Sequence, residues 1–259
     1  MYPNLFGIDG FSMVVMILIG LIAASVLFFI YLSKAGVEKK SFLDLGVVIL
    51  ATAFMGIVFA ILFENIYEAI KASINGLIPR WTWGMTFYGG LIGGVATFIL
   101  MYRFYYLKHN KPIFDEILRI SPACITLGHG FGRIGCFLSG CCYGITTGTA
   151  WDIYFPYLGE YHLPTQLYEM AFLFVLSAIL AFLAFKHITD YTMLIYMGGY
   201  ATFRFIIEFF RGDERGQLAG LSPSQYWCIV IVLAIVPVYF LLKKFFFKKE
   251  DKLDEVQAS

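Results

Sequence analysis

The chain has 259 residues, of which 59% are hydrophobic and 14% are charged, and its formal net charge is +1. Soluble domains carry about 25% charged residues, so one compact core could not hold this much apolar surface and lipid must be part of the solvent. The net charge gives no indication of an acidic partner or of nucleic acid. Composition therefore predicts an all-α integral membrane protein.

Seven segments are apolar enough for membrane-spanning helices, which need about 20 residues each. The fourth is the weakest, because Arg119, His129 and Arg133 interrupt it, and a broken or partly re-entrant segment is the alternative there. In chain order the predicted spans are Phe11–Leu32, Leu43–Phe63, Gly84–Tyr102, Ile117–Leu138, Gln166–Phe185, Thr192–Phe210 and Ser224–Leu242.

The distribution of lysine and arginine sets the direction of these spans. With the N-terminus outside, most of the 19 basic residues fall in the inner loops and the C-terminal tail. We therefore expect an outer N-terminus, a cytoplasmic C-terminus and a loop region on the outer face. The first span lacks a basic n-region, so it is expected to be a retained helix.

A single polytopic membrane domain is expected over residues 1–247, followed by a polar cytoplasmic tail at residues 248–259 without fixed structure. The longest outer connection, about Ser139–Thr165, has room for a short strand pair or an interfacial segment such as Trp151–Tyr157.

An arginine lies among glycines near the outer end of the fourth span, in the segment GHGFGRIGCFLSGCCYG at 128–144. Charges inside a span are costly and are functional candidates by default. Glycines let a ligand approach the backbone closely, and the guanidinium of Arg133 matches a phosphate. The segment predicts a phospholipid headgroup pocket, with Arg133 facing a lateral cavity open to lipid. The alternative is close helix packing by the glycines, with Arg133 snorkelling to the interface.

A second pair of charges, Arg204 and Glu208, is four residues apart, so both side chains share one helix face. One interpretation is a self-neutralising structural ion pair within the bundle. The other is that both side chains line the cavity of Arg133, with Arg204 closer to the phosphate. Under either interpretation this face points to the protein interior.

Two further segments have a structural and a functional interpretation. HLPTQLYE at 162–169 is typical of a helix start, because Pro164 and Thr165 suit its first turn and Glu169 suits the helix dipole. TFYGGLIGG at 86–94 lies at an outer helix end, where the glycines suit close helix packing and Tyr88 suits the interface.

The five cysteines are Cys124, Cys136, Cys141, Cys142 and Cys228. The first and last fall in spans and are expected to act as small hydrophobic residues. The middle three gather at the predicted pocket, and lining its wall is the favoured interpretation. A disulfide, a thiolate nucleophile and a metal site with His129 nearby are the alternatives. Their spacing matches no zinc signature, so we expect no metal and no cofactor.

The motifs TFYGGLIGG, GRIGCFLSGCCYG, LPTQLYE and YATFRFIIEFFR, followed by LSPSQ, resemble those of the bacterial prolipoprotein diacylglyceryl transferase family over roughly residues 40–235. The resemblance implies a seven-helix enzyme of the bacterial plasma membrane with its site near the outer face. Such an enzyme moves the diacylglyceryl group of phosphatidylglycerol, or a similar anionic phospholipid, to the lipobox cysteine of a lipoprotein precursor and releases glycerol phosphate. Nucleic acid is not an expected partner.

The resemblance also assigns roles to residues of this chain. The arginines would hold the phosphate and stabilise charge on the leaving group, and Glu208 would orient Arg204 or a headgroup hydroxyl. The expected catalytic residues are Arg133, Arg204, Glu208 and Tyr88. The expected substrate-binding residues are Gly89, Gly90, Gly132, Gly135, Cys136, Cys141, Tyr143, Gly144, Gln166 and Tyr168.

The chain departs from the family pattern at several of its polar positions. Tyr88 and Leu163 stand where the family has histidine, Cys136 and Ser139 where it has asparagine, and Cys141 where it has an acidic residue. Tyrosine is a poor base near neutral pH. A different membrane acceptor, such as a lipid or glycan hydroxyl, is therefore one alternative, and a non-catalytic lipid-binding protein is another.

Overall fold

The computed structural model describes residues 4–5, 8–9, 11–74, 76, 78–82, 84, 86–156, 158–213 and 220–257, with the backbone alone at 4–5, 8–9, 87–88 and 245–257. Helices dominate, as predicted. The elements are β1 (Asn4–Leu5), β2 (Ile8–Asp9), α1 (Phe11–Lys34), α2 (Ser41–Ile74), α3 (Phe87–Met101), the π-helix η1 (Tyr102–Tyr106), α4 (Leu107–His109), α5 (Phe114–Leu138), β3 (Ile153–Phe155), β4 (Glu160–His162), α6 (Thr165–Phe185), α7 (Thr192–Ile207), the 3-10 helix η2 (Glu208–Phe210) and α8 (Pro223–Gln257).

Six helical segments among the described residues are long and apolar enough to cross a membrane, and they match six of the predicted spans. They are Phe11–Lys34, Ser41–Ile74, Gly89–His109, Thr165–Phe185, Thr192–Phe210 and Pro223–Lys244. The remaining predicted span, Ile117–Leu138, corresponds to α5, whose 25 residues are enough for a crossing of about 37 Å. α8 continues to Gln257, into the polar tail for which no fixed structure was expected.

The fourth predicted span is one continuous helix, α5, and not a broken or re-entrant segment. Pro122 lies inside it, and neighbouring backbone carbonyls accept additional hydrogen bonds. Thr126 Oγ1 donates to the Pro122 carbonyl over 2.9 Å, and Ser177 Oγ of α6 donates to the Ala123 carbonyl over 2.8 Å. The polar side chains of α5 are tolerated because protein rather than lipid surrounds much of this helix.

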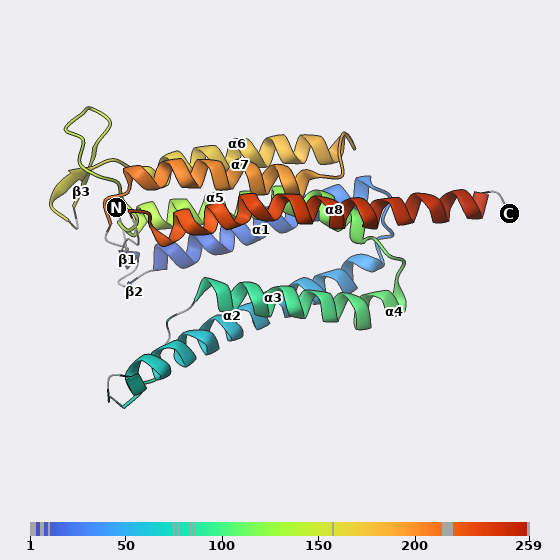
Figure 1. Cartoon of the computed structure of the whole chain (residues 1–259), viewed down its shortest axis with the longest axis horizontal. Helices are drawn as coiled ribbons and strands as arrows, with labels where there is room; N and C mark the ends of the chain where they lie inside the picture. The colour runs from blue at the N-terminus through green and yellow to red at the C-terminus, as the bar shows by residue number, and fades with distance from the viewer. Residues whose placement is uncertain are drawn as a thin grey trace. The chain divides into compact units, whose positions relative to one another are not determined.

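The chain forms two compact units, Met1–Leu32 with Phe114–Ser259, and Ser33–Ile113. In the first unit, α1 and α6 run antiparallel to α5. Gly20 of α1 lies against Phe131, and Phe174 of α6 lies against Gly130. α7 packs against α5, α6 and α8, and Figure 1 shows these helices running side by side. The ends of α5 and α7 therefore meet the starts of α1, α6 and α8.

The opposite end of the first unit is held by a charged cluster. Arg119 of α5 pairs with Glu116 over 2.6 Å and with Asp190, which precedes α7. Tyr31 near the end of α1 donates to Glu116, and Thr192 Oγ1 donates to the Arg119 carbonyl over 2.8 Å. These contacts join α1, α5 and α7 far from Arg133.

The connection between α5 and α6 contains a short strand pair, as its length allowed. β3 and β4 are antiparallel, with Ile153 opposite His162 and Phe155 opposite Glu160. The Phe155 ring is buried and contacts the ring of Tyr143, which comes shortly after α5. This packing fixes the backbone that follows the end of α5.

The second unit is built on α2 and α3. α2 continues to Ile74, well past the predicted end at Phe63. Residues 64–74 are more polar than the predicted span, but they belong to the same helix. Asn65 fastens the following connection, since its side chain donates to the Thr82 carbonyl over 2.9 Å and accepts from the Thr82 amide over 2.8 Å.

Candidate active site

Glu169, in the second turn of α6, joins the two arginines that the sequence singled out. Its Oε1 lies 2.9 Å from Arg133 Nη2, and its Oε2 lies 4.0 Å from Arg204 Nη1. The Glu169 side chain is 1% exposed. A buried carboxylate is stable only when it is paired, so this contact gathers side chains from α5, α6 and α7 into one cluster.

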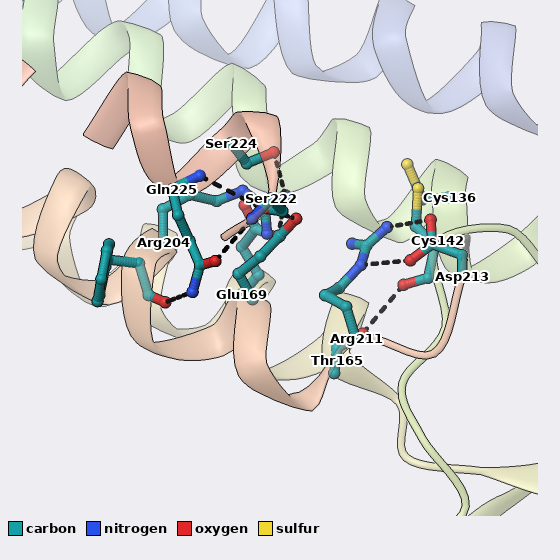
Figure 2. Close-up of polar contacts among 12 residues, drawn as sticks. Cys136, Cys142, Thr165, Glu169, Arg204, Arg211, Asp213, Ser222, Ser224 and Gln225 are labelled. Carbon is teal, nitrogen blue, oxygen red and sulfur yellow. Dashed lines mark hydrogen bonds and ion pairs between the residues drawn. The ribbon is translucent and has the colours of Figure 1, made fainter. Parts of the chain in front are cut away.

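Arg204 and Glu208 form the ion pair that their spacing predicts, with 2.6 Å between Arg204 Nη2 and Glu208 Oε2. Figure 2 shows how the start of α8 completes this contact. Ser222 Oγ donates to Glu208 Oε1 over 2.8 Å, and Arg204 Nη2 donates to Ser224 Oγ over 3.3 Å. The charged pair therefore links the end of α7 to the start of α8.

Two aromatic rings lie beside the Glu169 carboxylate. The Tyr200 hydroxyl of α7 donates to Glu169 Oε1 over 2.9 Å. His129 Nε2 of α5 lies 3.9 Å from the same oxygen, and the rings of His129 and Tyr200 meet edge to face at 5.2 Å. Glu169 is thus the centre of the polar network.

The cluster contains buried polar atoms that are available to a ligand. Within the described residues, Arg133 Nε and Arg204 Nη1 donate no hydrogen bond, and Glu169 Oε2 accepts none. Leaving such atoms unpaired is costly. Two guanidinium donors and one carboxylate acceptor suit a ligand that carries both an anionic oxygen group and a hydroxyl.

Three thiols adjoin this cluster at the end of α5. The Sγ atoms of Cys136, Cys141 and Cys142 all lie within 4.8 Å of one another. Gly140 and Cys142 have positive φ angles of 71° and 66°, and this turn folds the chain back toward Cys136. Arg133 Nη1 lies 4.0 Å from Cys136 Sγ.

The turn that carries the thiols is held from α6 and from the segment after α7. Gln166 Nε2 donates to the Cys141 carbonyl over 2.6 Å. Thr165 Oγ1 donates to the Cys142 carbonyl over 3.0 Å, and Figure 2 shows these two residues. Arg211 pairs with Asp213 over 2.7 Å. Hydrogen bonds from the other two thiols, and the Arg211 guanidinium, lower the pKa of Cys142.

The predicted glycines have different surroundings. A Cβ at Gly132 would meet no atom within 4 Å, so the helix surface there is open. At Gly135 it would lie 2.7 Å from Met13 Sδ, so this glycine serves the packing of α1 on α5. At Gly144 it would lie 2.7 Å from the Phe210 carbonyl oxygen and 2.8 Å from that of Leu163. Only glycine permits these backbones to approach so closely.

The predicted aromatic residues of the first unit lie outside the arginine cluster or beside it. The Tyr143 ring packs on the His162 ring at 4.5 Å, as part of the strand-pair packing. Tyr168 is half-buried and precedes Glu169 on α6.

Tyr88, Gly89 and Gly90 belong to the second unit. The Tyr88 side chain lies outside the described residues. A Cβ at Gly89 would lie 2.6 Å from the Phe59 carbonyl oxygen, and one at Gly90 would lie 3.4 Å from Ala60 Cβ. Close packing of α3 on α2 accounts for both glycines, and a part in lipid binding stays a prediction for all three residues.

Sequence reasoning treated Glu169 as a helix-start residue and missed its central position. The missing signal was charge balance: two arginines inside the bundle need two acids near them, and Glu208 supplies only one. Tyr200 and Ser222 were also missed, because their contacts join segments that are distant in the sequence.

An apolar groove lies on α7 and α8, the helices that carry Arg204 and Ser224. Its volume is about 260 Å³. The lining residues are Ala201, Thr202, Phe205, Ile206, Cys228, Ile229, Val232 and Leu233. The groove has the size and polarity to hold part of a hydrocarbon chain.

Comparison with known proteins gives consistent matches over most of the chain. A family model described as prolipoprotein diacylglyceryl transferase matches residues 5–241. The phosphatidylglycerol–prolipoprotein diacylglyceryl transferase 2 of Clostridium perfringens is 29% identical over 93% of this chain and 94% of its own length. Proteins named phosphatidylglycerol–prolipoprotein diacylglyceryl transferase are 30% identical in Clostridium tetani, over 91% of this chain and 94% of the relative, and in Pseudoalteromonas atlantica, over 86% and 80%. The chain belongs to the prolipoprotein diacylglyceryl transferase family.

Proposed function

We propose that this protein transfers the diacylglyceryl group of phosphatidylglycerol, or of a similar anionic phospholipid, to the lipobox cysteine of a prolipoprotein. The observation that carries the proposal is that Glu169 joins two arginines in the bundle, the buried Arg204 and the half-buried Arg133. Two guanidiniums from neighbouring helices suit the oxygens of one phosphate. Relatives at about 30% identity that are named for this reaction support the same function.

The headgroup of phosphatidylglycerol carries the groups that the cluster can bind. Its phosphate accepts hydrogen bonds from Arg133 Nε and Arg204 Nη1, and a glycerol hydroxyl donates to Glu169 Oε2, three buried atoms that form no hydrogen bond within the described residues. The apolar groove on α7 and α8 receives one acyl chain. Gly132, with its open surroundings, and the neighbouring thiols face the headgroup.

In the reaction, the acceptor thiol loses its proton to water, and its sulfur attacks the glyceryl carbon that carries the phosphate. The new carbon–sulfur bond forms as the carbon–oxygen bond breaks, and the oxygen leaves with the electron pair as part of glycerol phosphate. Negative charge grows on this leaving group, where Arg133 and Arg204 stabilise it. Glu169 and Glu208 position the guanidiniums.

The excess of basic residues in the predicted inner loops supports an orientation with the cluster near the outer face of a bacterial plasma membrane. There it meets precursors after their translocation.

The test is a transfer assay with purified protein in phosphatidylglycerol vesicles and a lipobox peptide. Thioether formation is followed by mass spectrometry, together with release of glycerol phosphate. Arg204→Lys keeps the charge but loses the planar fork, so activity should fall at least about tenfold. Arg103→Lys, at an exposed arginine of η1, should transfer at the wild-type rate. Equal rates for both variants would contradict the proposed role of Arg204.

A second candidate is transfer to a hydroxyl acceptor, such as a lipid or glycan. The observation that favours it is that thiols, and not an acid and an amide, stand beside Arg133. Labelled phosphatidylglycerol distinguishes the candidates, because the label moves either to the lipobox peptide or to a membrane lipid or glycan. Binding of phosphatidylglycerol without release of glycerol phosphate would indicate a lipid-binding protein.

A further inference from the structure

We propose that Cys136, Cys141 and Cys142 form a three-thiolate site for a zinc-class cation, whose fourth position binds the acceptor thiol. The inference deepens the transferase function proposed above and rests on it, because it assigns the activation of the acceptor to these three residues. It departs from the expectation, drawn from sequence spacing, that the chain binds no metal.

The geometry of the thiols is close to that of a metal site. In tetrahedral sites the zinc–sulfur distance is about 2.3 Å, which places pairs of sulfurs about 3.8 Å apart. The three Sγ atoms all lie within 4.8 Å of one another, so small rotations of the side chains can bring all three to one cation. Soft thiolate ligands select zinc-class cations over magnesium or calcium.

The backbone that carries the thiols is held in place before any cation binds. Gln166 and Thr165 of α6 hold the carbonyls of Cys141 and Cys142. The Cys141 amide donates to the Cys136 carbonyl over 3.1 Å. Cys142 adopts the left-handed conformation, with φ 66°, which is uncommon for a residue other than glycine. A metal site built on a fixed turn needs little rearrangement.

The surrounding charges suit a metal that is bound by thiolates. Three thiolates and a divalent cation leave one net negative charge, and an acceptor thiolate adds another. Arg133 Nη1, 4.0 Å from Cys136 Sγ, offsets part of this charge. Outer groups of this kind tune the ligands of a metal.

One side of the thiol group is open to solvent. Cys136 is buried, Cys142 is half-buried and Cys141 is exposed. A zinc site with three protein ligands keeps a position for water or substrate, in contrast to a closed structural site with four. A thiol peptide can therefore approach the fourth position from the side of Cys141.

The cation removes the need for a general base at the acceptor thiol. A thiol that binds the cation loses its proton to water and becomes a thiolate. This sulfur then attacks the glyceryl carbon and forms the carbon–sulfur bond. The carbon–oxygen bond breaks, and its electron pair leaves on glycerol phosphate, beside Arg133. The cation is not consumed, and no oxidation or reduction takes place.

The first test measures cation binding by the purified full-length protein, with cobalt(II) as a spectroscopic substitute for zinc. The wild type and Cys124→Ala, a control in the middle of α5, should each bind about one equivalent with tetrahedral cobalt–thiolate bands. Cys141→Ser removes an exposed ligand, so the fold is retained and cobalt affinity should fall by roughly tenfold or more. Equal binding by wild type and Cys141→Ser overturns the inference. A second outcome also overturns the inference. In it, two of these thiols form a disulfide in the purified wild type, and the protein binds no cobalt after that disulfide is reduced.

The second test separates this inference from the transferase function. Removal of the cation with a chelator should abolish transfer to the lipobox peptide, and zinc should restore it in the wild type but not in Cys141→Ser. Transfer that persists after chelation overturns the inference and leaves the transferase function in place. A zinc-loaded protein that transfers nothing overturns the transferase function and the role of the cation in it. The number of cobalt ions bound per chain then still shows whether the three thiols form a metal site.

Discussion

Glu169 shows how one buried carboxylate can organise a polar site in a membrane protein. It contacts side chains from α5 and α7 and receives a hydrogen bond from Tyr200. Neither arginine could remain in the bundle interior at low cost without a nearby negative charge. The positions of Arg133 and Arg204 therefore depend on a residue outside the sequence motifs that contain them.

Replacing this carboxylate tests that dependence. Glu169→Gln keeps the shape and the hydrogen-bond acceptor but removes the charge. Loss of one partner from a buried ion pair costs about 3–5 kcal/mol, so we expect a lower thermal unfolding temperature and loss of most transfer activity. Glu38→Gln, at an exposed carboxylate paired with Lys40, is the matched control and should change neither. A stable, active Glu169→Gln protein would show that the arginines hold their places without it.

At the scale of elements, the segment from α5 to β3 combines an open helix face with a tightly packed turn. Gly132 has free space where a Cβ would stand, whereas Gly144 is enclosed by the carbonyls of Phe210 and Leu163. The first glycine keeps room beside Arg133, and the second lets three chain segments meet. Glycine is needed at these two positions for different physical reasons.

Alanine substitutions separate these two reasons. Gly144→Ala should destabilise the protein by about 1–3 kcal/mol or more, because backbone atoms cannot move aside as side chains can. Gly132→Ala should keep or raise stability by up to about 1 kcal/mol, since alanine favours a helix. It should nevertheless raise the KM for phosphatidylglycerol if the headgroup occupies this space. Thermal unfolding in detergent and transfer kinetics measure the two effects, and a stable Gly144→Ala would refute the packing argument.

At the scale of the whole molecule, the orientation in the membrane is a prediction that reporter fusions can check. Alkaline phosphatase needs disulfides, which form only on the outer side of the membrane. A phosphatase fused after Gly148, in the connection between α5 and α6, should be active, and one fused after His187, between α6 and α7, should be inactive. The reverse pattern would place the arginine cluster near the cytoplasm and would exclude the proposed meeting with translocated precursors.

Hydropathy and charge predicted much of the fold, because lipid imposes length and composition on every span. α1, α6 and α7 begin and end close to their predicted limits. The extension of α2 past Phe63 was missed because residues 64–74 are too polar for a hydropathy signal. The site was predicted only in part. Spacing within one helix indicated the pair of Arg204 and Glu208, whereas the contacts of Glu169 and Cys142 depend on packing between distant segments.

The charge balance of the arginine cluster has a consequence for product release. Arg133 and Arg204 are matched by Glu169 and Glu208, so the cluster has no excess positive charge before the donor binds. A phosphodiester brings one negative charge, but the released phosphomonoester carries about 1.5 to 2 at pH 7. The cluster gains no cation to match the second charge, and glycerol phosphate has no acyl chain for the apolar groove, so it is bound more weakly than the intact lipid donor. We therefore expect little product inhibition, and the weakest inhibition above pH 7, where the monoester is fully ionised.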